Sequence, residues 1–217
     1  MPTSSPRAPR RDALRNRERV LTAAERVFAE RGLSATLEEV AASAGVGVGT
    51  VYRGFHSKTA LLEAVFERRL DAGTELLDEC RRRPSAWDGL REFLRRSLLQ
   101  QADDRGLHEF LYTVDTDRTR FDRLRARIEP PLTDLIERAK AEGALRADFR
   151  ATDVPLLILM FSRLAHTDRT LGPPMARRYL ELLLNGLAPG ADRGPIEPAL
   201  SDDALGDWLT GIGRARP

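Results

Sequence analysis

Cysteine is nearly absent from this sequence, since Cys80 is the only one among 217 residues. A single thiol excludes an internal disulfide and any zinc site built from several thiolates. Long hydrophobic runs are also missing, because no stretch approaches the ~20 apolar residues that a membrane-spanning helix needs. There is no strand signal, neither sustained alternation of apolar and polar residues nor a hairpin turn between β-branched runs. Together with apolar residues at helical spacing, these absences predict a soluble, all-α fold.

Catalytic and metal-binding patterns are scarce as well. The sequence contains no glycine-rich phosphate loop, no HExxH motif and no nucleophile between a strand and a helix, so we do not expect an enzyme. His108 and His166 have no partner three or four residues away, and we expect no metal site and no cofactor. The first residues, MPTSSPRAPRR, lack the apolar segment of a signal peptide, so a cytoplasmic protein is expected.

Charge is unevenly distributed although the net charge is only +2. Residues 1–60 contain 10 Lys and Arg against 6 Asp and Glu, a net of +4, so the rest of the chain carries −2. A basic excess in one segment is typical of a nucleic-acid binder. Residues 1–10 contain three prolines and are expected to form a disordered basic arm, which either lies against DNA or is a solvated tail.

The stretch from Thr36 to Lys58, TLEEVAASAGVGVGTVYRGFHSK, has the pattern of a helix-turn-helix. Thr36 and Glu39 form a capping box that starts a helix. Gly45 ends that helix, because glycine enters the left-handed conformation without steric cost. A second helix from about Gly47 to Phe55 follows after so few residues that the two helices must cross steeply.

The second helix has little bulk along its leading edge, Gly47-Val48-Gly49-Thr50. Small first residues allow a helix to approach base edges in the major groove of DNA. Base contacts are expected near the start of this helix and phosphate contacts around it. The predicted DNA-binding residues are Thr36, Gly47, Val48, Gly49, Thr50, Tyr52, Arg53, His56 and Lys58, of which Val48, Gly49, Thr50 and Arg53 are expected to contact bases.

This stretch resembles the DNA-binding domain of TetR-family transcriptional regulators. The resemblance rests on the Thr-initiated helix, Ala41-x-x-Ala44-Gly45-Val46, Gly49-Thr50-Val51-Tyr52, Phe55, and Ser57-Lys58 followed by Ala60-Leu61-Leu62. The sequence departs from the family pattern at Gly47, where serine is frequent, and at Gly54, where a larger residue is common. The alternative interpretation is a tight helical hairpin without a role in DNA binding.

Helical stripes and helix-ending residues divide the chain. We predict a disordered arm at 1–10, a helix-turn-helix domain at 11–58, a helical effector-binding and dimerisation domain at 59–188 and a mostly flexible tail at 189–217. The first helix is predicted over 11–31 with an apolar stripe from Leu14, and short helices are predicted around 107–114 and 201–209. Ser57 is expected to cap a long helix linking the domains, and Ser85 to begin a second capping box with Asp88. Pro130-Pro131 are expected to interrupt and kink a helix over 121–142.

Two late helices, 153–167 and 174–187, are apolar on more than one face and must be covered on two sides. In TetR-like regulators the last two helices form a four-helix dimer interface, so the resemblance implies a homodimer whose paired recognition helices bind a palindromic operator. A fully intramolecular core is the alternative. The residues predicted to contact a second subunit are Leu156, Leu159, Met160, Arg163, Tyr179, Leu180, Leu183, Leu184 and Leu187.

The resemblance also implies a cavity for a small-molecule effector among the body helices. The predicted lining residues are Trp87, Phe93, Leu94, Ser97, Gln101, His108, Phe110, Leu111, Val114, Phe121, Arg125 and Ile128. For each of them, plain core packing is the alternative role. An inward-facing Arg125 or Arg127 would indicate an anionic effector, whereas solvent-facing arginines would not.

The function that these patterns favour is a ligand-responsive transcriptional repressor that an effector releases from its operator. The alternative is a small-molecule carrier or interaction protein with a vestigial helix-turn-helix, and the salt dependence of DNA binding discriminates between the two. Three arginines follow Cys80 directly, so this residue is either an oxidation-sensing thiolate of lowered pKa or an inert cysteine.

Overall fold

The computed structural model describes residues 7–102, 118–167, 170–189 and 199–212, and these residues contain helices and no strand. The elements are α1 (Arg7–Arg31), a 3-10 turn (Gly32–Ser34), α2 (Leu37–Ala44), α3 (Val48–Phe55), α4 (Lys58–Arg81), α5 (Ala86–Ala102), α7 (Arg118–Ala141), α8 (Asp153–Thr167), α9 (Gly172–Gly186) and α10 (Asp202–Ile212). The all-α prediction is confirmed over this part of the chain. No helix within these ranges is both long and apolar enough to span a membrane.

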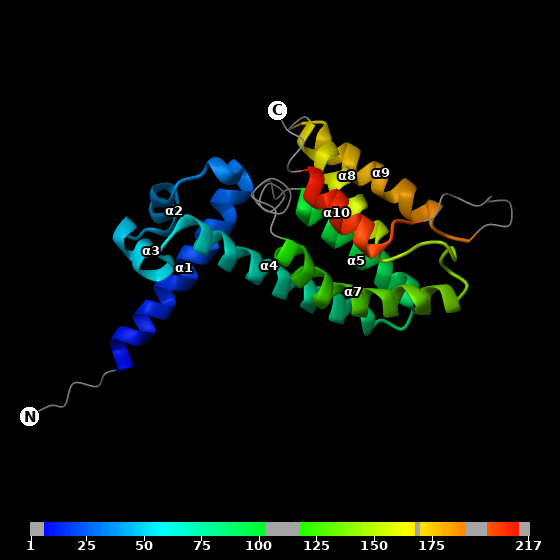
Figure 1. Cartoon of the computed structure of the whole chain (residues 1–217), viewed down its shortest axis with the longest axis horizontal. Helices are drawn as coiled ribbons and strands as arrows, with labels where there is room; N and C mark the ends of the chain where they lie inside the picture. Colours follow the sequence, from blue (N-terminus) through cyan, green and yellow to red (C-terminus); the bar gives the residue numbers. More distant parts are fainter. Residues whose placement is uncertain (1–6, 103–117, 168–169, 190–198, 213–217) are drawn as a thin grey trace, which may run out of the picture.

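The molecule has a small head and a larger body joined by the long helix α4 (Figure 1). The head comprises α1, α2 and α3 with the first half of α4, and its core includes Val20, Phe28, Val40, Val51 and Leu61. The body packs α5, α7, α8 and α9 around a second core that the last turns of α4 enter. One helix therefore contributes side chains to both cores.

The local signals for the head helices are confirmed. Thr36 and Glu39 form both hydrogen bonds of a capping box at the start of α2. Gly45 ends α2 with φ of 64°, a conformation in which a Cβ atom would be strained. Ser57 Oγ accepts from the backbone N–H of Ala60, 3.1 Å away, and caps α4.

The first helix begins earlier than predicted. It starts at Arg7, so the last residues of the predicted disordered arm are helical. Pro9 is compatible with this start, because the N–H groups of a first helical turn have no partner within the helix. The apolar stripe begins later than predicted, since Leu14 is 67% exposed and burial starts at Val20.

The second predicted capping box forms only in half. Ser85 Oγ accepts a hydrogen bond from the N–H of Asp88 at 3.1 Å, as predicted. The carboxylate that caps this helix start is not that of Asp88 but that of Glu142, which lies 55 residues after Trp87 in the sequence. Glu142 accepts from the N–H groups of Ala86 at 2.7 Å and Trp87 at 3.1 Å. These backbone hydrogen bonds lower the pKa of Glu142. The start of α5 is thereby joined to the region just after α7.

One prediction about the second half of the chain needs correction, and another is confirmed. Helix α7 is not interrupted at Pro130-Pro131 but continues through both prolines to Ala141. The burial of Leu135 and Ile136 beyond them holds the second half of the helix in register. The short helix predicted around 201–209, within the mostly flexible tail, is present as α10, which lies against α7, and Leu205 is only 2% exposed. The short helix predicted around 107–114 lies outside the described residues.

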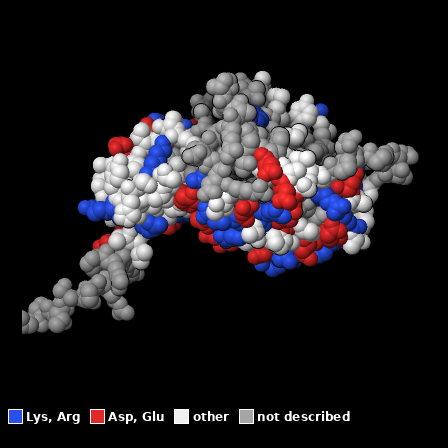
Figure 2. Space-filling view, viewed as in Figure 1, with Lys and Arg blue, Asp and Glu red and all other residues white. Residues whose placement is uncertain are grey.

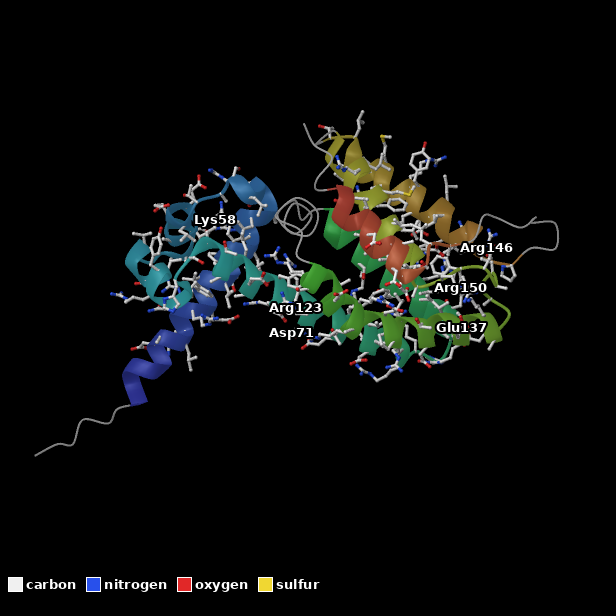
Figure 3. The ribbon with its side chains drawn as sticks, in the orientation of Figure 1. Lys58, Asp71, Arg123, Glu137, Arg146 and Arg150 are labelled. Carbon is white, nitrogen blue, oxygen red and sulfur yellow. The ribbon has the colours of Figure 1, made fainter. Side chains whose placement is uncertain are left out.

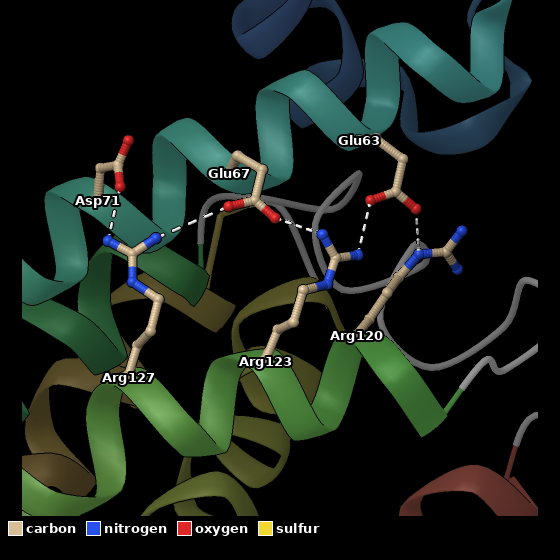
Figure 4. A network of polar contacts seen from close by, with 6 residues as sticks. All are labelled: Glu63, Glu67, Asp71, Arg120, Arg123 and Arg127. Atoms are coloured by element: carbon tan, nitrogen blue, oxygen red, sulfur yellow. Dashed lines mark hydrogen bonds and ion pairs between the residues drawn. The ribbon is translucent and has the colours of Figure 1, made fainter.

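A ladder of ion pairs joins α4 to α7 close to the head (Figure 4). Arg123 bridges two carboxylates of α4, with its Nη2 atom 2.9 Å from Glu63 and its Nη1 atom on Glu67. The pairs are Arg120–Glu63, Arg123–Glu63, Arg123–Glu67, Arg127–Glu67 and Arg127–Asp71. Basic and acidic side chains are also interspersed over the visible face of the body (Figure 2).

Candidate DNA interface and effector cavity

Helix α3 is anchored to the head along one side and open along the other. Val51 and Phe55 are buried in the head core, whereas Val48, Tyr52 and Arg53 are exposed. The N-cap residue is Gly47, which has no side chain to cap the first N–H groups of the helix. Thus α3 is held by its buried face and presents the remaining residues to a partner.

The glycines of α3 are not required by packing inside the chain. A Cβ atom built on Gly47, Gly49 or Gly54 meets no other atom within 4 Å. Glycine inside a helix costs about 1 kcal/mol relative to alanine, and at Gly49 and Gly54 no packing contact offsets that cost. The missing bulk at the start of α3 therefore favours close approach by something outside the chain, as a DNA base edge requires.

Arginines of α1 hold the helix-turn-helix in place, a role that the sequence did not reveal. Arg17 donates to the carbonyl of Gly54 at 2.8 Å, and its guanidinium lies 4.2 Å from the centre of the Phe55 ring. Arg19 donates to the carbonyl of Ala44 at 2.7 Å, where α2 leaves carbonyls without helical partners. These contacts fix the geometry of the helix pair from outside the motif.

The predicted DNA-contacting side chains differ in whether they already have a partner within the chain. Tyr52 and Arg53 are exposed, and Arg53 makes a 3.2 Å hydrogen bond to the Thr50 hydroxyl on the same helix. Lys58, which lies in the head (Figure 3), instead donates a hydrogen bond from Nζ to the carbonyl of Leu33 and so connects α4 to the turn before α2. The exposed hydroxyl of Thr36 is already the cap of α2.

His56 occupies an unusual backbone conformation directly after α3. Its φ is 60°, the only positive value for a non-glycine residue in the described ranges. Its N–H donates to the carbonyl of Tyr52 at 2.8 Å and so ends the helix. A strained residue at this point, beside the predicted DNA contacts, is typical of functional sites.

The body contains a largely apolar cavity of about 130 Å³. It lies between α4, α5, α7 and α8, and α10 supplies part of its wall. Of the predicted lining residues, Phe93, Ser97, Arg125 and Ile128 lie in its wall. The lining residues that the sequence did not indicate are Phe66, Arg69, Leu70, Gly73, Leu124, Glu129, Leu132, Ala151, Thr152, Val154, Pro155, Ile158, Asp202 and Leu205.

The other predicted cavity residues either lie outside the cavity wall or have side chains that the structure does not describe. Leu94 is fully buried in the body core, and Trp87 lies half-buried beside Arg91, so neither lines the cavity. Gln101 and Phe121 lie on α5 and α7, but their side chains are outside the described part of the structure. His108, Phe110, Leu111 and Val114 also lie outside the described residues.

The two arginines that would indicate an anionic effector are already neutralised. Arg125 lines the cavity but forms ion pairs with Glu129 at 2.6 Å and Asp202 at 2.5 Å. The hydrogen bond to Glu129 raises the pKa of Arg125, although burial of the guanidinium acts in the opposite direction. Arg127 lies in the ladder and pairs with Asp71 at 2.6 Å. An effector carboxylate would have to displace existing partners.

Helices α8 and α9 each have a buried and an exposed face. The exposed apolar side chains are Met160 on α8, Met175, Tyr179 and Leu182 on α9, and Leu171 just before α9. The four from Leu171 to Leu182 recur at intervals of three or four residues and form a stripe along one side of the helix. This α9 stripe faces away from the core of its own chain.

The structure corrects the predicted dimer contacts. Leu180 and Leu184 are completely buried in the body core, and Leu187 and Leu159 are nearly so, which leaves them unavailable to a second subunit. Leu156 and Leu183 are half-buried, whereas Met160, Arg163 and Tyr179 are exposed as the prediction requires. The sequence reasoning missed Leu182 and Met175 because helical spacing alone does not say which apolar face is inward.

Cys80 is fully buried in the body core. Burial raises the pKa of its thiol, although the nearby Arg83 favours the thiolate. Reactive cysteines are partly exposed and have a lowered pKa. The oxidation-sensing interpretation is therefore contradicted, and Cys80 is a packing residue.

Comparisons with known proteins match both parts of the chain. Residues 20–65 match the model of the TetR family of bacterial regulatory proteins, and residues 85–189 match the C-terminal domain of SbtR-like transcriptional regulators. An HTH-type transcriptional regulator of Staphylococcus aureus is 38% identical over 63 residues, which cover 29% of this chain and 34% of that protein. The chain thus matches about a third of the length of that curated relative.

Solved structures match over most of the chain. A TetR transcriptional regulator from Streptomyces coelicolor is 31% identical with a TM-score of 0.63, over 81% of this chain and 99% of that one. A TetR transcription regulatory protein from Mycobacterium vanbaalenii is 30% identical with a TM-score of 0.62, over 83% of this chain and 99% of that one. The chain belongs to the TetR family of transcriptional regulators, with a DNA-binding helix-turn-helix head and a helical C-terminal domain.

Proposed function

We propose that this regulator is a repressor that binds a palindromic operator as a homodimer and leaves it when a small molecule enters the body cavity. The observation that carries the proposal is the open start of α3. Two glycines there have no packing neighbours, and the exposed Tyr52 and Arg53 follow on the same helix. This combination suits a helix that docks end-first into a major groove.

The α9 stripe supports a homodimer. Monomeric proteins rarely expose contiguous apolar patches without a partner. A second copy provides the same stripe, and a two-fold axis allows each stripe to contact the other in an isologous interface. Two heads related by that axis would read two half-sites about 34 Å apart, which is why we propose a palindromic operator.

Helix α4 offers a route from the cavity to the head. Phe66 and Leu70 are buried in the head core and also line the cavity. A ligand that displaces either side chain therefore acts on the packing of the head directly. We propose that this changes the spacing of the two heads and weakens operator binding. The coupling fails if a ligand that releases DNA leaves the distance between the heads unchanged.

Selection from a library of random DNA duplexes tests the proposed function. Wild type is expected to recover one palindromic sequence, and its affinity must fall steeply with salt because several phosphates are contacted. The variants Thr50→Ala and Tyr52→Ala are expected to lose it. Recovery of no preferred sequence would instead favour a small-molecule carrier, for which the cavity is the supporting feature.

A further inference from the structure

Helix α10 is a part of the cavity wall that neither family model covers, because the C-terminal match ends at residue 189. It lies over the body next to α7 (Figure 1). Two of its residues, Asp202 and Leu205, line the cavity, and Leu205 is buried. The cavity of this chain is therefore completed by a helix that lies beyond the residues matched by the family model.

The start of α10 is held by a charge contact. Asp202 accepts from Nη2 of Arg125 at 2.5 Å, and the same arginine is positioned by Glu129 through its Nε atom at 2.6 Å. The Ser201 hydroxyl accepts from the N–H of Ala204 at 3.3 Å and caps the helix. Because both carboxylates bind one guanidinium, the ion pair connects α10 to α7 across the edge of the cavity.

The same edge borders an outer groove. Glu129, Ala151, Thr152 and Asp202 line both the cavity and a groove of about 510 Å³ on its outer side. The Arg125–Asp202 pair thus stands where the cavity meets the groove. Separation of Asp202 from Arg125 would break the charge contact that holds the start of α10 to α7 at this junction.

The lining of the cavity indicates the chemistry of its ligand. Its charged groups are two arginines, Arg69 and Arg125, and two carboxylates, Glu129 and Asp202, so they balance. A charged ligand that pairs with one of these groups would leave the former partner of that group without a counter-charge, and an unpaired charge in a largely apolar cavity is costly. The remaining wall is mostly aliphatic and aromatic, and an apolar cavity of about 150 Å³ is known to hold one benzene ring.

We propose that α10 is a latched wall of the effector cavity, released when the Arg125–Asp202 pair opens, and that the cavity takes an uncharged, mainly apolar ligand about the size of one aromatic ring. This inference rests on the effector-binding part of the proposed function. It assigns the ligand class and the element that admits the ligand.

Three ligands of one carbon skeleton test the ligand class: benzyl alcohol, benzoate and benzylammonium. Binding to the full-length protein is followed by methyl NMR of Ile128, Ile158 and Leu205, which line the cavity. Benzyl alcohol is expected to shift these methyl signals saturably and to bind at least ~10-fold more tightly than either ion, since burial of a charge is costly. Equal or tighter binding of an ion, or no saturable shift with benzyl alcohol, would overturn the assignment.

The latch is tested with Asp202→Asn and its control Asp122→Asn, which removes the same charge from an exposed position of α7 outside the cavity. Asp202→Asn is expected to speed hydrogen exchange of the α10 amides up to about fivefold, the effect of losing one partly exposed ion pair. The association rate of benzyl alcohol should rise with it. Unchanged exchange and association rates, or equal changes in the control, would contradict a latch.

DNA binding separates this inference from the proposed function. If benzyl alcohol binds and the latch variant behaves as expected, but affinity for the selected duplex stays the same, then the cavity assignment holds and effector release is wrong. If the duplex is bound sequence-specifically and no uncharged ligand enters, the regulator stands and the cavity assignment is wrong.

Discussion

The head and the body of this regulator differ in how far apart in sequence their defining contacts lie. In the head, caps and turns formed by neighbouring residues start and end the two crossing helices, as with Thr36 and Glu39, and a few longer-range contacts such as Arg17 to Gly54 hold the pair in place. In the body, contacts over long sequence separations dominate, including Glu142 at the start of α5 and the bidentate Arg95–Glu181 pair at 2.7 Å between α5 and α9. The helices of the head can thus be predicted from local sequence patterns, whereas the cavity forms only where helices that are distant in the sequence pack together.

The two regions also differ in what they present. The head exposes polar and small residues on α3, whereas the body encloses a balanced, mainly apolar cavity and exposes the α9 stripe. This difference predicts that substitutions on the exposed face of α3 change DNA binding without changing assembly or ligand binding. Substitutions in the body should act through assembly, stability or ligand binding.

The largest expected effect comes from the α9 stripe. Tyr179→Glu places a charge at the proposed two-fold contact, so the protein should become monomeric in sedimentation experiments. Operator affinity should then fall by at least ~100-fold, because two half-sites are no longer bound by linked heads. Leu200→Glu, at an exposed leucine outside α8 and α9, is the control. A Tyr179→Glu dimer with normal operator affinity would show that the body pairs elsewhere.

Substitution of Arg53 should have a smaller effect, which is confined to DNA recognition by the head. Its side chain is exposed and bonded only weakly to Thr50, so Arg53→Ala should leave stability unchanged. It should lower discrimination between operator and mismatched DNA by roughly 1 to 3 kcal/mol if the guanidinium reaches a guanine. Competition binding with single-base variants of the operator measures this. Equal losses on specific and random DNA would make Arg53 a phosphate contact.

The Gly49→Ala substitution distinguishes the effect of this glycine on the stability of the head from its effect on DNA binding. The substitution should stabilise the head by up to about 1 kcal/mol, because space for a methyl group is open and alanine favours helix. Operator affinity should nevertheless fall if Gly49 approaches a base edge. Gly54→Ala, with the same open surroundings near the other end of α3, is the matched control for denaturant unfolding and DNA binding. Undiminished operator affinity in Gly49→Ala would remove the case for close approach.

The ladder between α4 and α7 should give the smallest effect and depend on pH. Burial raises the pKa of Glu63, but hydrogen bonds and charges of Arg120 and Arg123 outweigh it and leave the pKa lowered. A lowered folded-state pKa stabilises the protein above the unfolded value of about 4.3, and this is lost as pH falls through the folded value. Glu63→Gln should therefore destabilise by at most ~1 kcal/mol at pH 7 and by less near pH 3.

Urea unfolding at both pH values measures the contribution of the ladder. Glu75→Gln, an exposed position of α4 outside the ladder, is the control. A loss for Glu63→Gln that is the same at both pH values would mean that the carboxylate charge is not what stabilises the junction.

Local chemistry explains how much of the fold was predictable. The capping box at Thr36, the left-handed Gly45 and the Ser57 cap each depend on residues within a few positions, and all three are confirmed. The half-formed box at Ser85 shows the limit, because the competing carboxylate of Glu142 is distant in sequence. Lys58 shows the same limit, since its partner is the carbonyl of Leu33.

The candidate site was predictable in unequal parts. The exposed positions of α3 followed from sequence, but the cavity wall did not, because α4 and α10 residues such as Phe66 and Leu205 carry only an ordinary apolar pattern. The stripe on α9 could not be separated from its buried face, since Leu180 and Tyr179 are adjacent and both apolar. Only tertiary packing decides between such faces.

The most direct test of sequence-specific DNA binding compares two duplexes at physiological salt: the sequence recovered by selection and a scrambled duplex of identical composition. We predict that the dimeric protein binds the selected duplex at least ~1,000-fold more tightly, as specific DNA-binding proteins do. Equal affinities for the two duplexes would contradict it, because the open face of α3 would then read no sequence.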